Sequence, residues 1–141
     1  MTRLALVLAA LVLSIVSAAA QSSAGGDNQF HLIAANSNNS TLISPGQHTI
    51  HSVQLSGVGA APAYVKFYDK TTAPTCGTDT PVKVLMIPAA STAANGAGSN
   101  VTVALGSQFN SGIGICVVTG IADSDNTAVA ASTFNVNFDW K

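Results

Sequence analysis

The two cysteines are the residues of this 141-residue chain with the most definite chemistry. Cys76 and Cys116 lie outside any Cys-x-x-Cys motif, and neither has a histidine or a lysine beside it. A reactive thiol needs such a neighbour to lower its pKa, whereas an even number of cysteines in an oxidising compartment favours a disulfide. The sequence therefore predicts a structural Cys76–Cys116 disulfide, which would hold the loop around Cys76 against the strand that contains Cys116.

Histidine and aspartate do not have the spacing of a metal site. His48 and His51 are three positions apart, which puts them on opposite faces of a strand, and zinc needs three or four convergent ligands. The run from Asp123 to Asn126 resembles the start of a calcium loop, but Ala128 and Phe134 occupy the EF-hand positions for Gly and Glu. A capped polar turn explains this run more simply, and a weaker calcium site is the alternative. We predict no metal site and no cofactor.

Catalytic motifs do not stand out either. The sequence has no Gly-x-Ser-x-Gly elbow, and no pair of aspartates is marked as the acid and base of a glycosidase. The glycine pairs at residues 57–59 and 112–114 lack the third glycine of a dinucleotide-binding loop. We therefore expect a protein that is not an enzyme. A small secreted hydrolase with unrecognised aspartate chemistry is an alternative.

Tyr64, Lys66 and Tyr68 are the candidate binding residues. Side chains alternate along a strand, so these three share one face while Val65 and Phe67 share the other. An exposed Tyr-Lys-Tyr stripe could stack on a glycan or on a partner protein. The alternative is that the stripe is the polar side of a half-buried strand.

The first 20 residues have the organisation of a secretory signal peptide. Arg3 provides a positive start, residues 4–16 are almost entirely apolar, and the small residues 18–20 precede Gln21. The apolar run is shorter than the roughly 20 residues that a membrane-spanning helix needs. We expect residues 1–20 to be cleaved, and the mature chain to be secreted or periplasmic with no membrane span.

Charge excludes two further classes of partner. Beyond Arg3 the chain has four lysines, six aspartates, no arginine and no glutamate. Binding to nucleic acid needs clustered Lys and Arg that neutralise phosphates, and electrostatic binding to a membrane surface needs the same. No such cluster exists in the sequence, so we expect neither nucleic acid nor an anionic membrane to be a partner.

The elements that must position these residues are strands. Phe134, Val136, Phe138 and Trp140 alternate with polar residues, as in a strand with one buried and one solvated face. Short apolar segments bounded by Gly, Pro and Asn recur along the chain, and none of them has a helical period. The predicted strands cover residues 30–35, 49–55, 64–68, 82–87, 101–105, 113–119 and 134–141. We predict an all-β domain at 30–141, a single antiparallel β-sandwich of jelly-roll or immunoglobulin-like type with about seven strands, after a flexible lead-in at 21–29.

Several sequence blocks carry a resemblance to a known group of proteins. They are YVKFYDK at 64–70, AP at 73–74, GTDTPV at 77–82, SGIG at 111–114, TGIAD at 119–123 and TAVAA at 127–131. In this order the blocks resemble small, uncharacterised proteins encoded in bacteriophage and prophage genomes, over about residues 49–141. The resemblance implies a β-sandwich virion component of the capsid surface, tail or fibre.

These observations predict a non-enzymatic structural or surface-binding protein of phage lineage. It would be a virion component or an exported relative that acts in the host envelope. Its expected partners are other virion or envelope proteins, further copies of itself, or glycans. The alternative function is a secreted bacterial adhesion or carbohydrate-binding module that uses Tyr64, Lys66 and Tyr68.

Overall fold

The computed structural model describes residues 27–90 and 99–141, which form eight β-strands. The predicted signal peptide and residues 21–26 of the predicted lead-in lie outside these residues. The strands are β1 Asn28–Ile33, β2 Thr41–Pro45, β3 His48–Gly57, β4 Ala63–Asp69, β5 Lys83–Ile87, β6 Ser99–Phe109, β7 Gly112–Val118 and β8 Phe134–Trp140. Within the described ranges, no helix has the length and apolar character that crossing a membrane requires.

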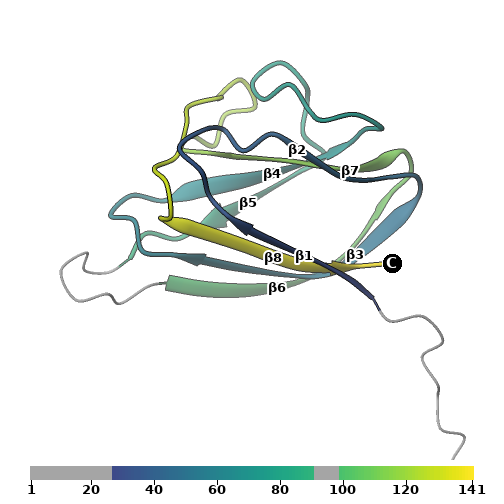
Figure 1. Cartoon of the computed structure of the whole chain (residues 1–141), viewed down its shortest axis with the longest axis horizontal. Coiled ribbons are helices and arrows are strands. Elements are labelled where there is room, and N and C mark those ends of the chain that lie inside the picture. Colours follow the sequence, from purple (N-terminus) through teal and green to yellow (C-terminus); the bar gives the residue numbers. More distant parts are fainter. Residues whose placement is uncertain (1–26, 91–98) are drawn as a thin grey trace, which may run out of the picture.

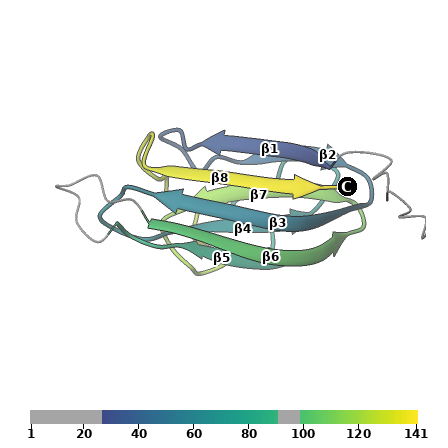
Figure 2. The same cartoon turned by 90° about the horizontal axis from the view of Figure 1, so that it is seen from below.

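The strands form two antiparallel four-stranded sheets that pack as a sandwich, so the predicted fold class is confirmed (Figure 1). One sheet has the order β1-β8-β3-β6 and the other the order β2-β7-β4-β5. Figure 2 shows the first sheet in front of the second. Each strand pairs with its counterpart from the other end of the series: β1 with β8, β2 with β7, β3 with β6 and β4 with β5. This nested pairing is a rolled-up hairpin, which makes the sandwich a jelly roll and not an immunoglobulin-like fold.

Seven of the eight strands lie where the sequence pattern predicts them, and β2 is the additional one. Thr41–Pro45 has only five residues, ends in a proline and follows a run of turn-forming residues. Those features predict a loop, since proline cannot donate to a ladder. The strand exists because it is at the edge of its sheet and pairs only with β7. At the N-terminal end, β1 begins at Asn28 and so takes up the last two residues of the predicted lead-in.

The core lies between the sheets and is built from alternate residues of their strands. Phe67 of β4 is near its centre, with its ring 6.3 Å from that of Phe109 and 5.7 Å from that of Phe138. β7 is buried along its whole length, as expected for a central strand that is apolar on both faces. The fully buried members include Ile50, Val53, Leu55, Val65, Ile113, Ile115 and Val117.

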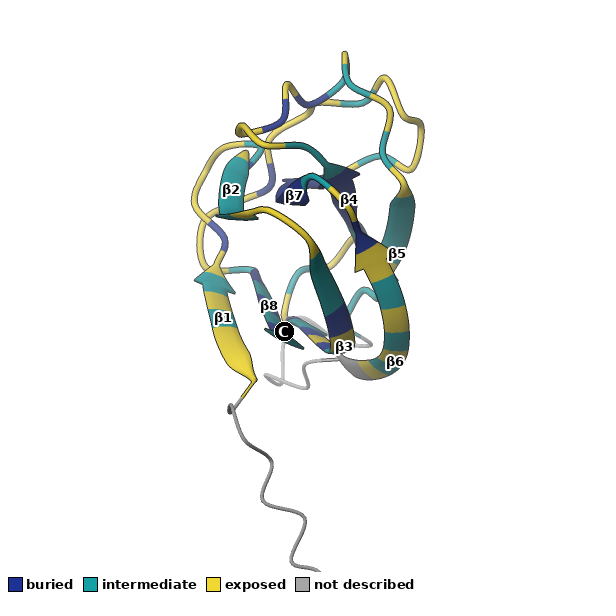
Figure 3. Ribbon diagram, turned by 90° about the vertical axis from the view of Figure 1, so that its right-hand side faces the viewer, coloured by how far each residue is buried: buried dark blue, intermediate teal, exposed yellow. Residues whose placement is uncertain are grey.

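The outer faces of the two sheets differ, and this difference positions the candidate site. The segments between β4 and β5 and between β7 and β8 fold back over the β2-β7-β4-β5 sheet and cover its two middle strands, β4 and β7. The outer face of the β1-β8-β3-β6 sheet has no such cover within the described chain. Figure 3 shows the contrast: β4 and β7 are coloured as buried, while β1 and β6 carry many exposed positions.

Candidate functional site

The predicted Cys76–Cys116 disulfide is present on the covered face. Its two Cα atoms are 6.0 Å apart, and Cys116 lies in the middle of β7. Both cysteines are buried in a small apolar cluster with Tyr68 and Val118. A disulfide of this kind forms and persists in oxidising compartments, so it indicates a location outside the cytoplasm.

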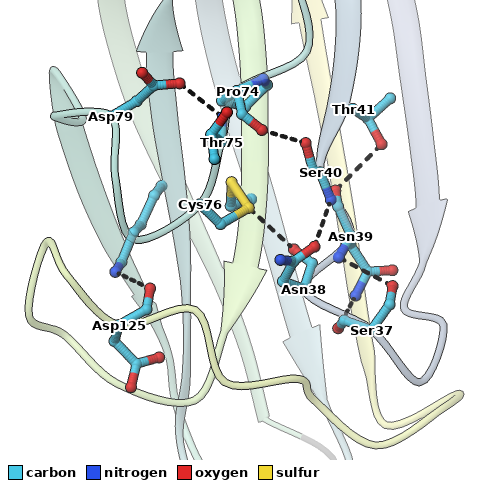
Figure 4. The surroundings of a disulfide bond; sticks show 12 residues. Ser37, Asn38, Asn39, Ser40, Thr41, Pro74, Thr75, Cys76, Asp79 and Asp125 are labelled. Atoms are coloured by element: carbon cyan, nitrogen blue, oxygen red, sulfur yellow. Dashed lines mark hydrogen bonds between the residues drawn. A yellow bond between two sulfur atoms is a disulfide. The ribbon is translucent and has the colours of Figure 1, made fainter.

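A neighbouring loop adds to the cover over the disulfide. The Ser40 hydroxyl donates a hydrogen bond to the carbonyl oxygen of Pro74, which joins the segment before β2 to the segment that holds Cys76 (Figure 4). The disulfide therefore does what the sequence predicts: it pins the β4–β5 loop onto one face of the sheet.

The prediction of an exposed Tyr-Lys-Tyr stripe is wrong. Lys66 and Tyr68 have no exposed surface, and Tyr64 is only partly exposed. The three residues do share one face of β4, but the two loops cover that face. A period-two pattern identifies which side chains share a face and does not reveal that a distant loop lies over them. These residues are therefore not available as a surface for a glycan.

Lys66 has a structural role beneath the loops. Its ammonium group donates hydrogen bonds to the carbonyl oxygens of Ala122 at 2.5 Å and Asp125 at 2.9 Å, with Asp123 O at 3.4 Å. An ammonium group has three donors and no acceptor, so three converging carbonyls match it. The Lys66 side chain thus links β4 to the β7–β8 loop that lies over it.

Tyr68 lies beside this lysine and is also enclosed. Burial, together with the negative charges of Asp79 and Asp123, raises the pKa of the Tyr68 phenol to about 12. Its hydroxyl oxygen is buried and has no hydrogen-bond partner among the described residues. The side chain stays neutral and packs against the disulfide.

The calcium-like run is a capped turn. The Asp125 carboxylate accepts hydrogen bonds from the backbone N–H groups of Gly120 and Thr127, both at 3.1 Å, and from the Thr127 hydroxyl at 3.2 Å. The carbonyl oxygens of Asp123 and Asp125 in the same run accept hydrogen bonds from the Lys66 ammonium group. The Asp125 carboxylate is therefore engaged within the turn. In the described part of the chain, no group of three or more His, Cys, Asp or Glu side chains is placed to hold a metal.

Two other aspartates also stabilise loops. Burial raises the pKa of Asp69, but hydrogen bonds from the backbone N–H groups of residues 110–112 outweigh it and hold that pKa below its usual value. Those N–H groups donate at 3.0, 2.6 and 3.2 Å, which ties the end of β4 to the β6–β7 turn. The pKa of Asp79 is lowered by its ion pair with Lys70 and by the Thr75 N–H.

A row of polar side chains crosses the exposed outer face of the β1-β8-β3-β6 sheet, with one residue from each of its four strands. His31 of β1 is opposite Asn137 of β8, which is opposite Gln54 of β3. Gln54 is in turn opposite Thr102 of β6. Neighbouring strands are about 4.8 Å apart, so the row crosses the sheet as a continuous series of amides, a hydroxyl and an imidazole.

A second polar row lies beside the first, two residues along each strand, and consists of Gln29, Asp139 and Ser52. The two rows line a shallow hollow of about 380 Å³. Within it the Ser52 hydroxyl donates to the Asp139 carboxylate at 2.9 Å, and His31 is hydrogen-bonded to the Asn137 side chain. The side chains of Gln29, Gln54 and Thr102 make no hydrogen bond to any described residue.

A more apolar hollow adjoins this one on the same face. The next row contains Ile33, Asn135 and Ser56, and the side chains of Ile33 and of Val58, just after β3, are exposed. These residues line a space of about 370 Å³ with Gly57, Ser132, Thr133 and Phe134. We call the two hollows together the sheet groove.

Sequence reasoning did not identify the sheet groove, although part of its signal is visible. The polar residues that alternate along β8 predict a solvated face for that strand. They do not predict which strands lie beside β8. The strand order brings the polar residues of β1, β3, β6 and β8 together, and that order depends on long-range pairing.

Two solved structures of the Tobacco streak virus coat protein are similar to this chain. One aligns with 82% of this chain and 87% of the coat protein, with 10% sequence identity and a TM-score of 0.32. The coat protein dimer aligns over 79% of this chain and 85% of that chain, with 12% identity and a TM-score of 0.30. No family model and no curated protein sequence matches the chain. The chain therefore has a distant structural similarity to a plant virus coat protein.

Proposed function

We propose that this protein is a non-enzymatic binding or structural protein of phage lineage that works outside the cytoplasm. It acts by contacting other macromolecules, and the sheet groove is the surface that makes the contact. Its partners are virion or envelope proteins, further copies of the chain, or glycans. The observation that carries this proposal is the difference between the two sheet faces. Loops cover the middle strands of one face, and the other displays polar side chains that make no hydrogen bond to the described residues.

The use of the charged side chains supports a role without catalysis. Asp69, Asp79 and Asp125 each accept hydrogen bonds from backbone N–H groups. Lys66 binds backbone carbonyls, and Lys70 pairs with Asp79. Acid–base catalysis needs such groups to be free to exchange protons with a substrate, whereas here they stabilise turns and loops.

The resemblance to phage-encoded proteins gains a physical basis from the fold. Its first block lies on β4 and its last two blocks lie in the β7–β8 loop. The Lys66 ammonium group of the first block binds the carbonyls of Ala122 and Asp125 in and beside the block at 119–123. Blocks far apart in the sequence thus form one contact unit, which supports reading them as a single inherited pattern.

The test is to locate the protein and determine its covalent state. Mass spectrometry of cytoplasm, envelope, medium and purified particles should find it outside the cytoplasm, beginning at Gln21. Its mass should be about 2 Da below the reduced mass because one disulfide has formed. Stoichiometric amounts in particles would identify a virion component, and its presence only in the envelope or medium would identify an exported relative. A reduced, uncleaved chain confined to the cytoplasm would overturn the proposal.

The second candidate is a secreted adhesion or carbohydrate-binding module. The specific observation in its favour is the sheet groove, and not the stripe of Tyr64, Lys66 and Tyr68, which is buried. Retention of the purified protein on intact cells distinguishes a module of this kind from a virion component. Under this second function, replacing groove residues should release the protein from the cells.

A further inference from the structure

We infer that the sheet groove is a binding site for a neutral oligosaccharide. This inference rests on the proposed function, because it names the ligand of the surface through which the protein is proposed to act. Gln54 and Asn137 lie at the centre of the site, on the two inner strands of the sheet.

The groove side chains match the hydrogen bonding of sugar hydroxyls. Amide side chains donate through NH₂ and accept through C=O, and Ser and Thr hydroxyls do both. Sugar hydroxyls likewise donate and accept, so each can be paired by a neighbouring amide or hydroxyl. Gln54 and Thr102 are exposed, lie on adjacent strands opposite one another, and have side chains that make no hydrogen bond within the described chain. Groups of this kind are available to a ligand without breaking a bond within the protein.

The charge of the groove selects against anionic ligands. Asp139 is its one carboxylate among the described lining residues, and no lysine lines either hollow. Phosphate and sulfate groups are recognised by Arg and Lys, which make charge-assisted hydrogen bonds to them. A phosphorylated, sulfated or uronic acid-rich glycan would instead meet the Asp139 carboxylate, with no lysine or arginine in the lining to pair with its negative charges. The ligand class is therefore a neutral saccharide.

A protein partner fits this surface less well. The centre of a protein interface is depleted in charge and enriched in aromatic residues. Here the centre is a row of amides and a hydroxyl, and the rings of Phe30 and Phe138 belong to the core. The apolar end at Ile33 and Val58 provides a place for the C–H face of a sugar ring or for a methyl substituent.

The size and setting of the groove also suit an oligosaccharide. Its two hollows of about 380 and 370 Å³ are each within the range of small-molecule sites, roughly 300–1,000 Å³. All the residues that line the polar hollow are on strands, so their positions are fixed before the ligand arrives. A preorganised site loses less conformational entropy on binding than a flexible one.

The experiment is an NMR titration of the oxidised, isotope-labelled mature protein. The probes are neutral hexasaccharides of glucose, mannose, galactose and N-acetylglucosamine, with sulfated dextran as the anionic comparison. We expect saturable shifts in the side-chain NH₂ signals of Gln54 and Asn137 with at least one neutral probe, and no saturable shift with sulfated dextran. Gln54→Ala and Asn137→Ala should each weaken binding about fivefold, the factor expected for one lost hydrogen bond. Gln47→Ala changes an exposed glutamine outside the groove and should leave binding unchanged.

Three outcomes would overturn the inference. These are no saturable binding to any neutral probe at millimolar concentration, shifts confined to residues outside the groove, or preferential binding of sulfated dextran. If a groove variant no longer associates with particles or cells although the native protein binds no saccharide, that result would contradict the ligand class and leave the proposed function intact. A cytoplasmic, reduced protein would remove the proposed function itself. The folded state of each variant is checked by its thermal unfolding.

Discussion

The ammonium group of Lys66 lies 2.9 Å from the carbonyl oxygen of Asp125, although 59 positions separate the two residues. This contact joins the outer face of β4 to the β7–β8 loop. The Cys76–Cys116 disulfide joins the same sheet to the β4–β5 loop. Together the two links close one face of the jelly roll and leave the opposite face as its polar surface.

Replacing Lys66 by methionine should destabilise the protein strongly. The variant keeps a similar side-chain length but removes the ammonium group from which the carbonyls of Ala122 and Asp125 accept hydrogen bonds. A hydrogen bond to a charged group contributes about 1.5–3 kcal/mol, so we expect a loss of about 3 kcal/mol in the free energy of unfolding. Chemical denaturation monitored by Trp140 fluorescence measures it.

Lys83→Met is the matched control for this change. Lys83 is partly exposed and makes one side-chain hydrogen bond, to the Ser107 hydroxyl at 3.3 Å. We expect a loss below about 1 kcal/mol. Equal losses for the two variants would contradict the role of Lys66 as the anchor of the loop.

Removing the disulfide should cost about as much as removing the lysine anchor. Cys76 and Cys116 are 40 positions apart, and the chain-entropy estimate for a loop of that size is about 4 kcal/mol. Denaturation of the protein with and without reductant measures the difference. Reductant should have no effect on the Cys76→Ser/Cys116→Ser double variant, which separates loss of the disulfide from any other action of the reductant.

Stability should decrease as the solution becomes acidic, with Asp69 as a principal cause. Its pKa is lower in the folded state than in the unfolded chain, so the unfolded chain binds the proton first. The stabilisation is therefore complete above the ordinary aspartate pKa of about 3.9 and is lost as the pH falls through the lower folded value. Asp79 contributes in the same direction.

Asp69→Asn tests this assignment. Denaturation midpoints measured between about pH 6 and pH 2 should depend less steeply on pH in this variant than in the native protein. Asp27→Asn is the control, since Asp27 is exposed and makes no hydrogen bond to the described residues. If both variants keep the native pH dependence, the backbone hydrogen bonds to Asp69 do not cause it.

The sequence predicts the strands well because each strand's own residues carry the alternating pattern. Phe134 to Trp140 shows this most clearly, and β7 is recognisable because both of its faces are apolar. β2 is missed because a five-residue edge strand with a terminal proline resembles a loop. The burial of Lys66 and the existence of the sheet groove are missed for a different reason. Both depend on which distant segments meet, and the pattern within a single strand does not contain that information.

Tyr68 gives a prediction that separates burial from hydrogen bonding. Its pKa of about 12 lies above the unfolded value of about 10, so the native state favours the neutral phenol. The titration of this group therefore leaves stability unchanged below about pH 10, and it lowers the stability of the folded state as the pH rises from about 10 to 12. Because the buried hydroxyl has no partner in the described structure, Tyr68→Phe removes an uncompensated polar group and no hydrogen bond. At neutral pH this variant should be as stable as the native protein or slightly more stable, and its alkaline loss of stability should be smaller.

Spectroscopic titration of the two tyrosines, together with denaturation at neutral and alkaline pH, provides the measurement. A clear loss of stability at neutral pH would mean that the hydroxyl has a partner in solution.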